Sequence, residues 1–463
     1  MKLRKWQSEC VTKALGHYTS IKKHFLCLAT PGAGKTIMAA EVAFELYRQK
    51  KIDFVLCFSP STSVSESIQK TFSQRFGLRF DGVIGAIGSS FTYQSILFFK
   101  PDFWELLQNN RVFVIFDEIH HCAGTSSENS NAWGEEIIQK IQKQSTYTLA
   151  LTGTPWRSDN SPIVLSSYTD TENIITCDYT YGLKDAVNDG VCRNPKIVLV
   201  DNERITVTED DKESKSFTCF GDLLKESKVS YPSIISNYDV IRHILTKGCE
   251  KLAQIRIHTP NAGGLVVASS VKHASWILEI LIQELNQSAV LVTYKQTKPT
   301  RIIDNYKLSS TEWIVSVGMI SEGTDIPRLQ VCCHLSHVKT ELYFRQVLGR
   351  ILRVTSNANQ YAWLYTFAEP KLSKFAKRVD VELPEQDICR VDYLEDENRL
   401  IRNYFPIEVE GKHIETQPQE VDVIATLGGK SIFNPQVTIN FSLDILGSYR
   451  EQVIATFNSP FEL

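Results

Sequence analysis

The sequence predicts an α/β protein with two tandem, doubly wound parallel-sheet domains and a small β-containing C-terminal extension. Three observations support this fold class. The 463 residues suffice for two to four domains, and the 43% hydrophobic and 22% charged content is that of an ordinary globular protein. The short apolar runs are continuous rather than alternating, which suits parallel strands covered on both faces. Helical spacings follow these runs, and this strand-then-helix pattern occurs in two stretches of similar size.

The first predicted domain covers residues 1–190. Its strands are expected where short apolar runs end in turn residues, at residues 24–29, 53–58, 111–116 and 147–151. The first run breaks at Pro31 and Gly32, and apolar residues then recur with helical spacing from Thr36 to Arg48. This order predicts a strand, a glycine-rich turn and a helix in direct succession.

The second predicted domain covers residues 191–385. Its strands are expected at residues 264–268, 289–292, 313–317 and 361–366, and one helix at residues 276–285. Nine of the sixteen residues from Asp201 to Ser216 are charged. We therefore expect a solvated polar insertion or linker at about residues 201–230.

Residues 386–463 are predicted to form an acidic accessory tail. Their net charge is −7, whereas residues 191–385 carry +4. From Val437 to Ile445 apolar and polar residues alternate, which indicates a half-buried antiparallel strand. Such a strand could dock a protein partner by β-augmentation, or it could simply cap a domain. The carboxylates of the tail lack the paired spacing of a nuclease site.

Composition also limits the compartment and the partners. The eleven cysteines are scattered without any C-x-x-C pair, so we expect reduced thiols in a cytoplasmic protein and no zinc site. No apolar run has the ~18 residues of a membrane span, and the N-terminus does not resemble a signal peptide, so no membrane contact is expected. The net charge of −3 excludes a basic field over the whole molecule, and nucleic acid would have to be held locally.

A phosphate-binding loop is predicted at Ala29-Thr-Pro-Gly-Ala-Gly-Lys-Thr36. Gly32 and Gly34 allow backbone N–H groups to turn toward phosphates, and the N-terminus of the following helix favours an anion. Lys35 would reach the β- and γ-phosphates of a nucleotide, and Thr36 would bind Mg²⁺. A nucleotide with Mg²⁺ is therefore the expected ligand of this loop.

Two carboxylates follow another predicted strand. Asp117 and Glu118 come directly after the apolar run that ends at Phe116. A carboxylate at the C-terminal end of a strand beside a phosphate loop is well placed to hold Mg²⁺, which is the role expected of Asp117. Glu118 would orient and deprotonate the attacking water.

These segments resemble the motifs of superfamily 2 helicases, and they occur in that family's order. Asp117-Glu-Ile-His120 resembles a DExH box. The Q motif and motifs Ia, Ib, III, V and VI resemble residues 3–7, 59–61, 92–95, 151–157, 318–325 and 346–353, respectively. The resemblance covers residues 1 to about 380 and is nearest to the DExH branch that includes restriction-enzyme motor subunits and DNA-repair helicases.

The resemblance implies two RecA-like domains that bind ATP at their interface. It implies catalytic roles for Glu118, His120, Gln346, Arg350 and Arg353. It implies nucleotide contacts by Gln7, Gly32, Gly34, Lys35, Thr36, Asp117, Gly323 and Asp325, with Thr36 and Asp117 holding the metal. Because Arg350 and Arg353 lie on the second domain, hydrolysis would require the domains to close, and repeated closure on a bound strand would produce stepping.

The resemblance also implies coupling and nucleic-acid contacts. Thr152 and Thr154 would couple the two domains. Ser59, Ser61, Thr92, Gln94 and Thr324 would contact nucleic acid, mostly its backbone, so that sequence preference would be weak. The string Thr152-Gly-Thr154 differs from the Ser-Ala-Thr of DEAD-box RNA helicases, which favours DNA over RNA as the partner.

We therefore predict an ATP-dependent helicase or translocase that acts on DNA. Two alternatives stay open: an RNA helicase or RNA-sensing ATPase, and a nucleic-acid-gated ATPase switch in a multi-protein complex, such as one for antiviral defence. If the tail is a partner module, a chain ending near Glu385 should keep DNA-stimulated ATPase activity. If the strand ending at Ile445 pairs with a sheet of the motor, that shortened chain should aggregate.

Overall fold

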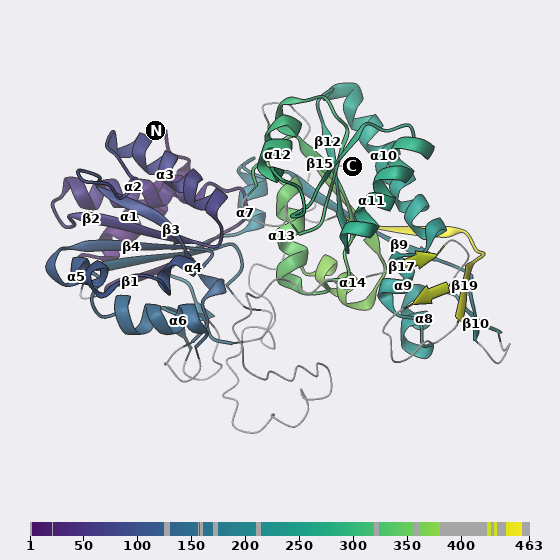
Figure 1. The fold of residues 1–463 in the computed structure, drawn as a ribbon, viewed down its shortest axis with the longest axis horizontal. Helices are drawn as coiled ribbons and strands as arrows, with labels where there is room; N and C mark the ends of the chain where they lie inside the picture. Colours follow the sequence, from purple (N-terminus) through teal and green to yellow (C-terminus); the bar gives the residue numbers. More distant parts are fainter. Residues whose placement is uncertain are drawn as a thin grey trace, which may run out of the picture.

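The computed structural model describes residues 2–20, 22–124, 130–155, 157, 161–169, 175–209, 214–318, 324–355, 361–379, 424–426, 430–432 and 441–455. These residues form two α/β bodies that lie side by side, each with a central sheet between helices (Figure 1). The predicted α/β class with tandem parallel-sheet domains is confirmed. No helix in these ranges is long and apolar enough to cross a membrane.

The first body is built on a six-stranded parallel sheet with the strand order β3-β2-β4-β5-β1-β8. Its strands are β1 (His24–Ala29), β2 (Phe54–Ser59), β3 (Gly88–Thr92), β4 (Val112–Asp117), β5 (Tyr147–Thr152) and β8 (Tyr179–Tyr181), and a separate small hairpin is formed by β6 (Ser167–Tyr168) and β7 (Ile175–Thr176). Its helices are α1 (Lys5–His17), α2 (Lys35–Arg48), α3 (Thr62–Phe76), α4 (Tyr93–Ile96), α5 (Pro101–Asn109), α6 (Ala132–Glu136), a π-turn (Ile137–Ile141) and α7 (Leu183–Asn188).

The strand order of the first sheet explains where its polar side chains gather. β4, β5 and β1 are neighbours, and all three are parallel. Because parallel strands present their carboxyl ends at one edge, the loops after them meet there. These loops begin at Glu118, Gly153 and Thr30, and each follows a strand whose apolar residues are buried on both faces.

The second body is built on a seven-stranded sheet with the order β13-β14-β12-β15-β16-β9-β20, in which only β20 is antiparallel to its neighbour. Its strands are β9 (Asn194–Asn202), β12 (Gly263–Ala268), β13 (Ala289–Val292), β14 (Trp313–Ser316), β15 (Leu329–Leu335), β16 (Tyr361–Phe367) and β20 (Tyr449–Ala455). Its helices are α8 (Phe220–Glu226), α9 (Tyr231–Ile235), α10 (Tyr238–His258), α11 (Val271–Glu279) with a π-turn (Ile280–Glu284), α12 (Pro299–Leu308), α13 (Glu341–Ile351) and α14 (Pro370–Lys377).

The segment expected to be a solvated insertion or linker, residues 201–230, differs from that expectation. Its described part is folded: β10 (Ile205–Glu209) pairs antiparallel with β11 (Ser214–Phe217), and α8 follows. Ile205 and Val207 alternate with Thr206 and Thr208, and the two apolar side chains are buried. The alternation of apolar and polar side chains with a period of two residues explains the strand, and the number of charged residues does not.

The C-terminal segment also differs from the expected separate accessory tail. β19 (Phe441–Ile445) pairs antiparallel with β10, and β20 pairs with β9 over seven positions, so both strands belong to the second body. An antiparallel strand was predicted from Val437 to Ile445; the part at 441–445 is found, while 437–440 lie outside the described residues. A short hairpin of β17 (Ile424–Thr426) and β18 (Lys430–Ile432) precedes them.

Candidate ATP site between the two bodies

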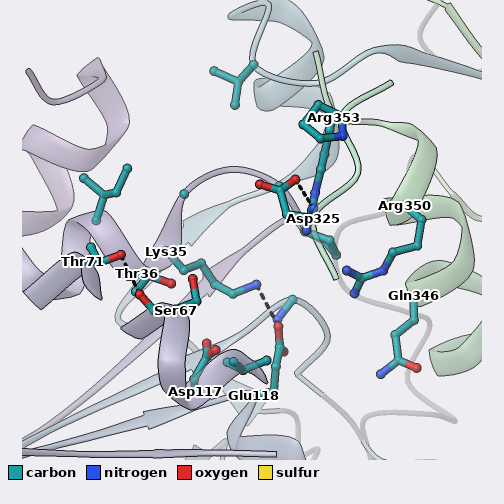
Figure 2. Close-up of a pocket in the computed structure, with 18 of the residues that line it drawn as sticks. Lys35, Thr36, Ser67, Thr71, Asp117, Glu118, Asp325, Gln346, Arg350 and Arg353 are labelled. Carbon is teal, nitrogen blue, oxygen red and sulfur yellow. Dashed lines mark hydrogen bonds and ion pairs between the residues drawn. The ribbon is translucent and has the colours of Figure 1, made fainter. Parts of the chain in front are cut away.

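The predicted phosphate loop lies between β1 and α2, as the sequence indicates. Gly32 and Gly34 adopt φ angles of 85° and 94°, a backbone conformation that side chains disfavour. Lys35 is the first residue of α2 and is 9% exposed. Its Nζ lies 3.0 Å from Glu118 Oε1 and donates a hydrogen bond to the Ala29 carbonyl at 3.2 Å (Figure 2).

Glu118 is held in an uncommon conformation at the end of β4. Its φ angle is 52°, and it begins a short 3₁₀ turn at Ile119–His121. The Gly153 N–H donates to Glu118 Oε2 at 3.0 Å, from the loop after β5. Burial by itself would raise the pKa of Glu118. The Lys35 ammonium, His120 and the Gly153 N–H together lower this pKa by more than burial raises it, so the net pKa lies well below its ordinary value. Glu118 is therefore a carboxylate at neutral pH.

The second body contributes cationic and amide side chains from α13 and the segment after it. Gln346 and Arg350 lie on α13, and Arg353 follows it. Arg350 and Arg353 donate to the same acceptor, the Thr324 carbonyl, at 2.9 and 3.0 Å. Arg353 also forms an ion pair with Asp325. Figure 2 shows the Arg350 and Gln346 side chains facing Lys35 and Glu118 across the space between the bodies.

The two bodies come into close contact beside the phosphate loop. A Cβ at Gly349 would lie 2.7 Å from Pro31 Cβ, and one at Gly32 would lie 3.2 Å from Arg353 Cγ. These glycines therefore permit an approach that a side chain would hinder. The cavity between the bodies has a volume of about 420 Å³. It is lined by side chains of both bodies, among them Lys35, Thr36, Asp117, Glu118, His120, Asp325, Gln346, Arg350 and Arg353.

Thr36 and Asp117 both line this cavity, and each carries side-chain oxygen of the kind that a hard cation prefers. Within the described ranges, no cluster of three histidine, cysteine or carboxylate side chains could hold a metal by itself. This arrangement fits Mg²⁺, which usually takes one or two protein oxygens and completes its shell with phosphates and water.

Gln7, expected to contact the nucleotide, is bonded to the phosphate loop and to Arg4 in this structure. A nucleotide contact by Gln7 stays a prediction. Its Nε2 donates to the Gly34 carbonyl at 2.9 Å, and its Oε1 accepts from the Arg4 N–H at 2.8 Å. Arg4, which the sequence interpretation did not single out, donates through Nη1 to the Ala33 carbonyl at 2.8 Å and lines the cavity. Gln7 therefore stabilises the phosphate loop through its bond to Gly34. Arg4 is the residue of the Q-like segment that lines the cavity.

His120 connects the DExH-like segment to the motif III-like segment. Its Nδ1 lies 3.0 Å from Thr152 Oγ1 and 3.5 Å from Glu118 Oε2. Thr152 Oγ1 donates to the Thr154 carbonyl at 2.6 Å, within the first body. Coupling of the two bodies by Thr152 and Thr154 stays a prediction, although Thr154 lines the cavity.

The predicted nucleic-acid residues are not all accessible. Ser59 is fully buried, with its Oγ 3.3 Å from the carbonyls of Ser61 and Phe91, so direct contact with nucleic acid is not supported. The cause is its place at the end of a central strand. Thr92 bonds to Ser95 within the α4 region, while Gln94 is exposed there. Ser61 caps α3.

Thr324 is the first described residue after a gap at residues 319–323 in the second body. Thr324 uses its carbonyl to hold Arg350 and Arg353, so its backbone supports the two arginines that line the candidate site. Gly323 lies outside the described residues. Thr324 as a nucleic-acid contact stays a prediction.

The sequence interpretation missed one wall of the cavity. Ser67 and Thr71 lie on α3 and line it, together with Val64 (Figure 2). Their spacing of four residues places both hydroxyls on one helix face. That spacing is a weak signal, and nothing in the sequence alone directs this face toward the phosphate loop.

Comparison with known proteins shows what these features resemble. A family model described as "Type III restriction enzyme, res subunit" matches residues 1–157. An uncharacterized protein of Mycobacterium leprae is 28% identical over an alignment of 404 residues that covers 82% of this chain and 64% of that protein. The DNA 3'-5' translocase XPB2 of Sulfurisphaera tokodaii is 23% identical over 382 residues, with 76% of this chain and 79% of that protein covered.

A solved structure is similar in fold. A fragment described as an HsdR subunit of a type I restriction enzyme from Vibrio vulnificus superposes with a TM-score of 0.57 at 17% identity, covering 82% of this chain and 67% of that one. The fold and the site define a two-body α/β protein with a phosphate loop. These similarities support the resemblance to superfamily 2 helicases that the motifs indicate. It spans 64% of the length of the Mycobacterium relative.

Proposed function

We propose that the protein is an ATP-dependent helicase or translocase that acts on DNA. One observation carries this proposal: Lys35 and Glu118 of the first body and Arg350 of the second line the same cavity of about 420 Å³. The charges are arranged as phosphoryl transfer requires, with cations on two sides of the position for the γ-phosphate and a carboxylate between them. Neither body contains this set by itself.

The Lys35–Glu118 ion pair suggests how nucleotide binding would prepare the base. Lys35 Nζ lies 3.0 Å from Glu118 Oε1, so phosphate oxygens entering the cavity would compete for the ammonium. Glu118 would then be released to accept a proton from the attacking water. Thr36 and Asp117 would hold Mg²⁺, which neutralises charge on the phosphates.

Arg350 and Arg353 would stabilise the charge that develops on the transferred phosphoryl group. Both are anchored on the Thr324 carbonyl of the second body, so their distance from Lys35 changes whenever the bodies move. Closure would complete the site, and opening after hydrolysis would release the products. Cycles of closure and opening on a bound strand would give translocation.

DNA is favoured as the partner by two findings. The relative from Sulfurisphaera tokodaii is named a DNA 3'-5' translocase, and this chain aligns with 79% of it. The Thr152-Gly-Thr154 segment also differs from the Ser-Ala-Thr of DEAD-box RNA helicases. Action on RNA, and a switch that hydrolyses ATP with little movement, are the alternative outcomes of the test.

The test compares ATPase rates of the full chain without nucleic acid and with single-stranded DNA, duplex DNA, branched DNA and RNA. We expect DNA to stimulate the rate more than RNA does. A triplex-displacement and a strand-displacement assay then separate movement from switching. Stimulation by RNA alone would contradict the DNA assignment, and DNA-stimulated hydrolysis without displacement in either assay would favour the switch. No hydrolysis with any nucleic acid would overturn the proposed ATPase function.

A further inference from the structure

Arg193 is a fully buried arginine at the start of the second body. Its guanidinium donates to three backbone carbonyls: Nη1 to Leu329 at 2.7 Å and to Ile351 at 3.0 Å, and Nη2 to Pro327 at 3.1 Å. Its backbone N–H donates to the Leu352 carbonyl at 2.7 Å. Burial lowers the pKa of Arg193 to about 10, so the group keeps its charge at neutral pH.

The three carbonyls belong to the two segments that hold the arginines of the ATP site. Ile351 ends α13, which carries Arg350, and it lies two residues before Arg353. Pro327 and Leu329 follow the segment whose Thr324 carbonyl accepts both arginines. The last carbonyls of a helix carry partial negative charge, so a buried cation there is favourable. Arg193 therefore ties the end of α13 to the residues that directly follow the motif V-like segment.

Arg193 also lies in the segment that joins the bodies, between α7 and β9. Its neighbour Cys192 forms a backbone bridge with Arg353, and the Cys192 Sγ lies 3.7 Å from the Pro31 carbonyl of the phosphate loop. Val191 lines the cavity. Consecutive residues of this connection thus contact the phosphate loop and the arginine-bearing segment.

We infer that Arg193 is a positioning residue that fixes Arg350 and Arg353 relative to Thr324 and passes movement of the inter-body connection to them. This inference rests on the proposed ATPase function. Lysine offers a compact point charge and cannot reproduce a planar fork that serves three carbonyls. A displacement of about 1 Å at a reacting centre can reduce the rate about 100-fold. Loss of Arg193 should therefore reduce turnover more than ATP binding.

The chain offers a matched control in Arg328. This arginine is also buried, at 8% exposure, and its guanidinium also donates to three backbone carbonyls, those of Asn261, Tyr306 and Thr311. It lies between Pro327 and Leu329 in the sequence, but its partners belong neither to α13 nor to the connection between the bodies. Substitution of Arg328 therefore tests how much kcat changes when these residues are loosened while Arg193 is kept.

The experiment measures kcat and KM for ATP with saturating DNA, together with melting curves, for the full chain and for Arg193→Lys, Arg193→Gln, Arg328→Lys and Arg328→Gln. For Arg193→Lys we expect kcat to fall about 10- to 100-fold, with KM for ATP changed less than about 3-fold. Both Arg328 variants should lower the melting temperature as much as their Arg193 counterparts but keep kcat within about 3-fold of the unsubstituted chain.

A second measurement addresses the transition state. ADP with aluminium fluoride mimics the transferring phosphoryl group, and Arg193→Lys should weaken its binding about 10-fold or more while ADP binds as before. Equal losses of kcat in Arg193→Lys and Arg328→Lys would overturn the inference. It would also be overturned if neither Arg193 variant folds while both Arg328 variants do, because Arg193 would then be a folding determinant. An unsubstituted chain without ATPase activity would refute the proposed function itself.

Discussion

The two halves of the candidate ATP site are held by different kinds of contact. In the first body, Lys35 and Glu118 follow buried parallel strands, and they hold each other at 3.0 Å. In the second body, Arg350 and Arg353 come from a helix and its end, and they rest on one backbone carbonyl, that of Thr324. The first half is fixed by the ends of β1 and β4, which lie in one sheet on either side of β5. The second half depends on segments brought together from residues 191–193, 324–329 and 346–353.

This difference suggests a division of labour. A half that is preformed by its sheet can bind a nucleotide before the bodies close. A half that is held by carbonyl contacts with the inter-body connection can change its position as that connection moves. Loss of a phosphate contact in the first half, such as that of Lys35, should therefore affect binding and turnover, whereas substitutions of the arginines in the second half should affect turnover alone.

The largest expected effect comes from the second half. Arg350→Ala and Arg353→Ala should each lower kcat about 10³- to 10⁵-fold, because they remove charge needed only in the transition state. Arg→Lys at either position should restore little, since a point charge does not copy the planar fork. Steady-state ATPase rates and a DNA-binding titration provide the measurements, and DNA binding should persist. Normal ATPase activity after both arginines are removed would refute a site shared by the two bodies.

The first half offers a contrasting pair of substitutions. Glu118→Gln should keep ATP binding and lower turnover about 10²- to 10⁴-fold, because it removes the base but leaves Asp117 available for Mg²⁺. Lys35→Ala should weaken both nucleotide binding and turnover, because the ammonium contacts the bound phosphates. Equilibrium binding of a fluorescent nucleotide and single-turnover hydrolysis separate the two effects. If Glu118→Gln hydrolysed ATP at the rate of the unsubstituted chain, Glu118 would not be the base.

The C-terminal strands β19 and β20 should contribute to the stability of the second body, to which they belong. A chain ending at residue 440 lacks β19 and β20 and should lose stability and aggregate, because the edges of β9 and β10 and the buried contacts of Leu443 are exposed. The loss of Leu443 alone is worth about 2–5 kcal/mol. A chain ending at residue 456 keeps both strands and serves as the control. Circular dichroism and melting curves provide the measurement, and an unchanged melting curve for the shorter chain would restore the accessory-tail interpretation.

Acidification should lower the stability of the second body more than that of the first. This effect is the smallest of those expected. Burial lowers the pKa of His243, His273 and His334 in the second body to about 4. The unfolded chain binds protons at these groups near pH 6.5, so their effect on stability is full above that pH and is lost as the pH falls toward 4. Between pH 7.5 and 5.5 the buried His273 and His334 should each lower the free energy of unfolding by about 1 kcal/mol, and the partly exposed His243 should lower it by less.

In the first body burial lowers the pKa of His24. Hydrogen exchange at the two pH values, resolved by peptide, reports each body separately. We expect protection in the second body to fall more, and His334→Gln should remove part of that dependence. An equal fall in both bodies would contradict the prediction.

The sequence by itself determined the parts of this protein that depend on neighbouring residues. The phosphate loop at residues 29–36 and the strand ending at Asp117 are local patterns, since glycines, a helix start and an apolar run suffice to specify them. The motif order then predicted which side chains of the second body would face them, and Gln346, Arg350 and Arg353 do line the cavity.

Only the tertiary structure decided how distant segments meet. β20 completes the sheet beside β9, from which it is separated by more than 200 residues, and its charges and alternation do not encode that partner. Gln7 turns toward the Gly34 carbonyl rather than the cavity, and Ser59 is buried, because sheet and helix packing fixes which face of each element is covered. Arg193 carries no motif at all. Its role follows from three carbonyls more than 130 residues away, which only folding brings within reach of its guanidinium.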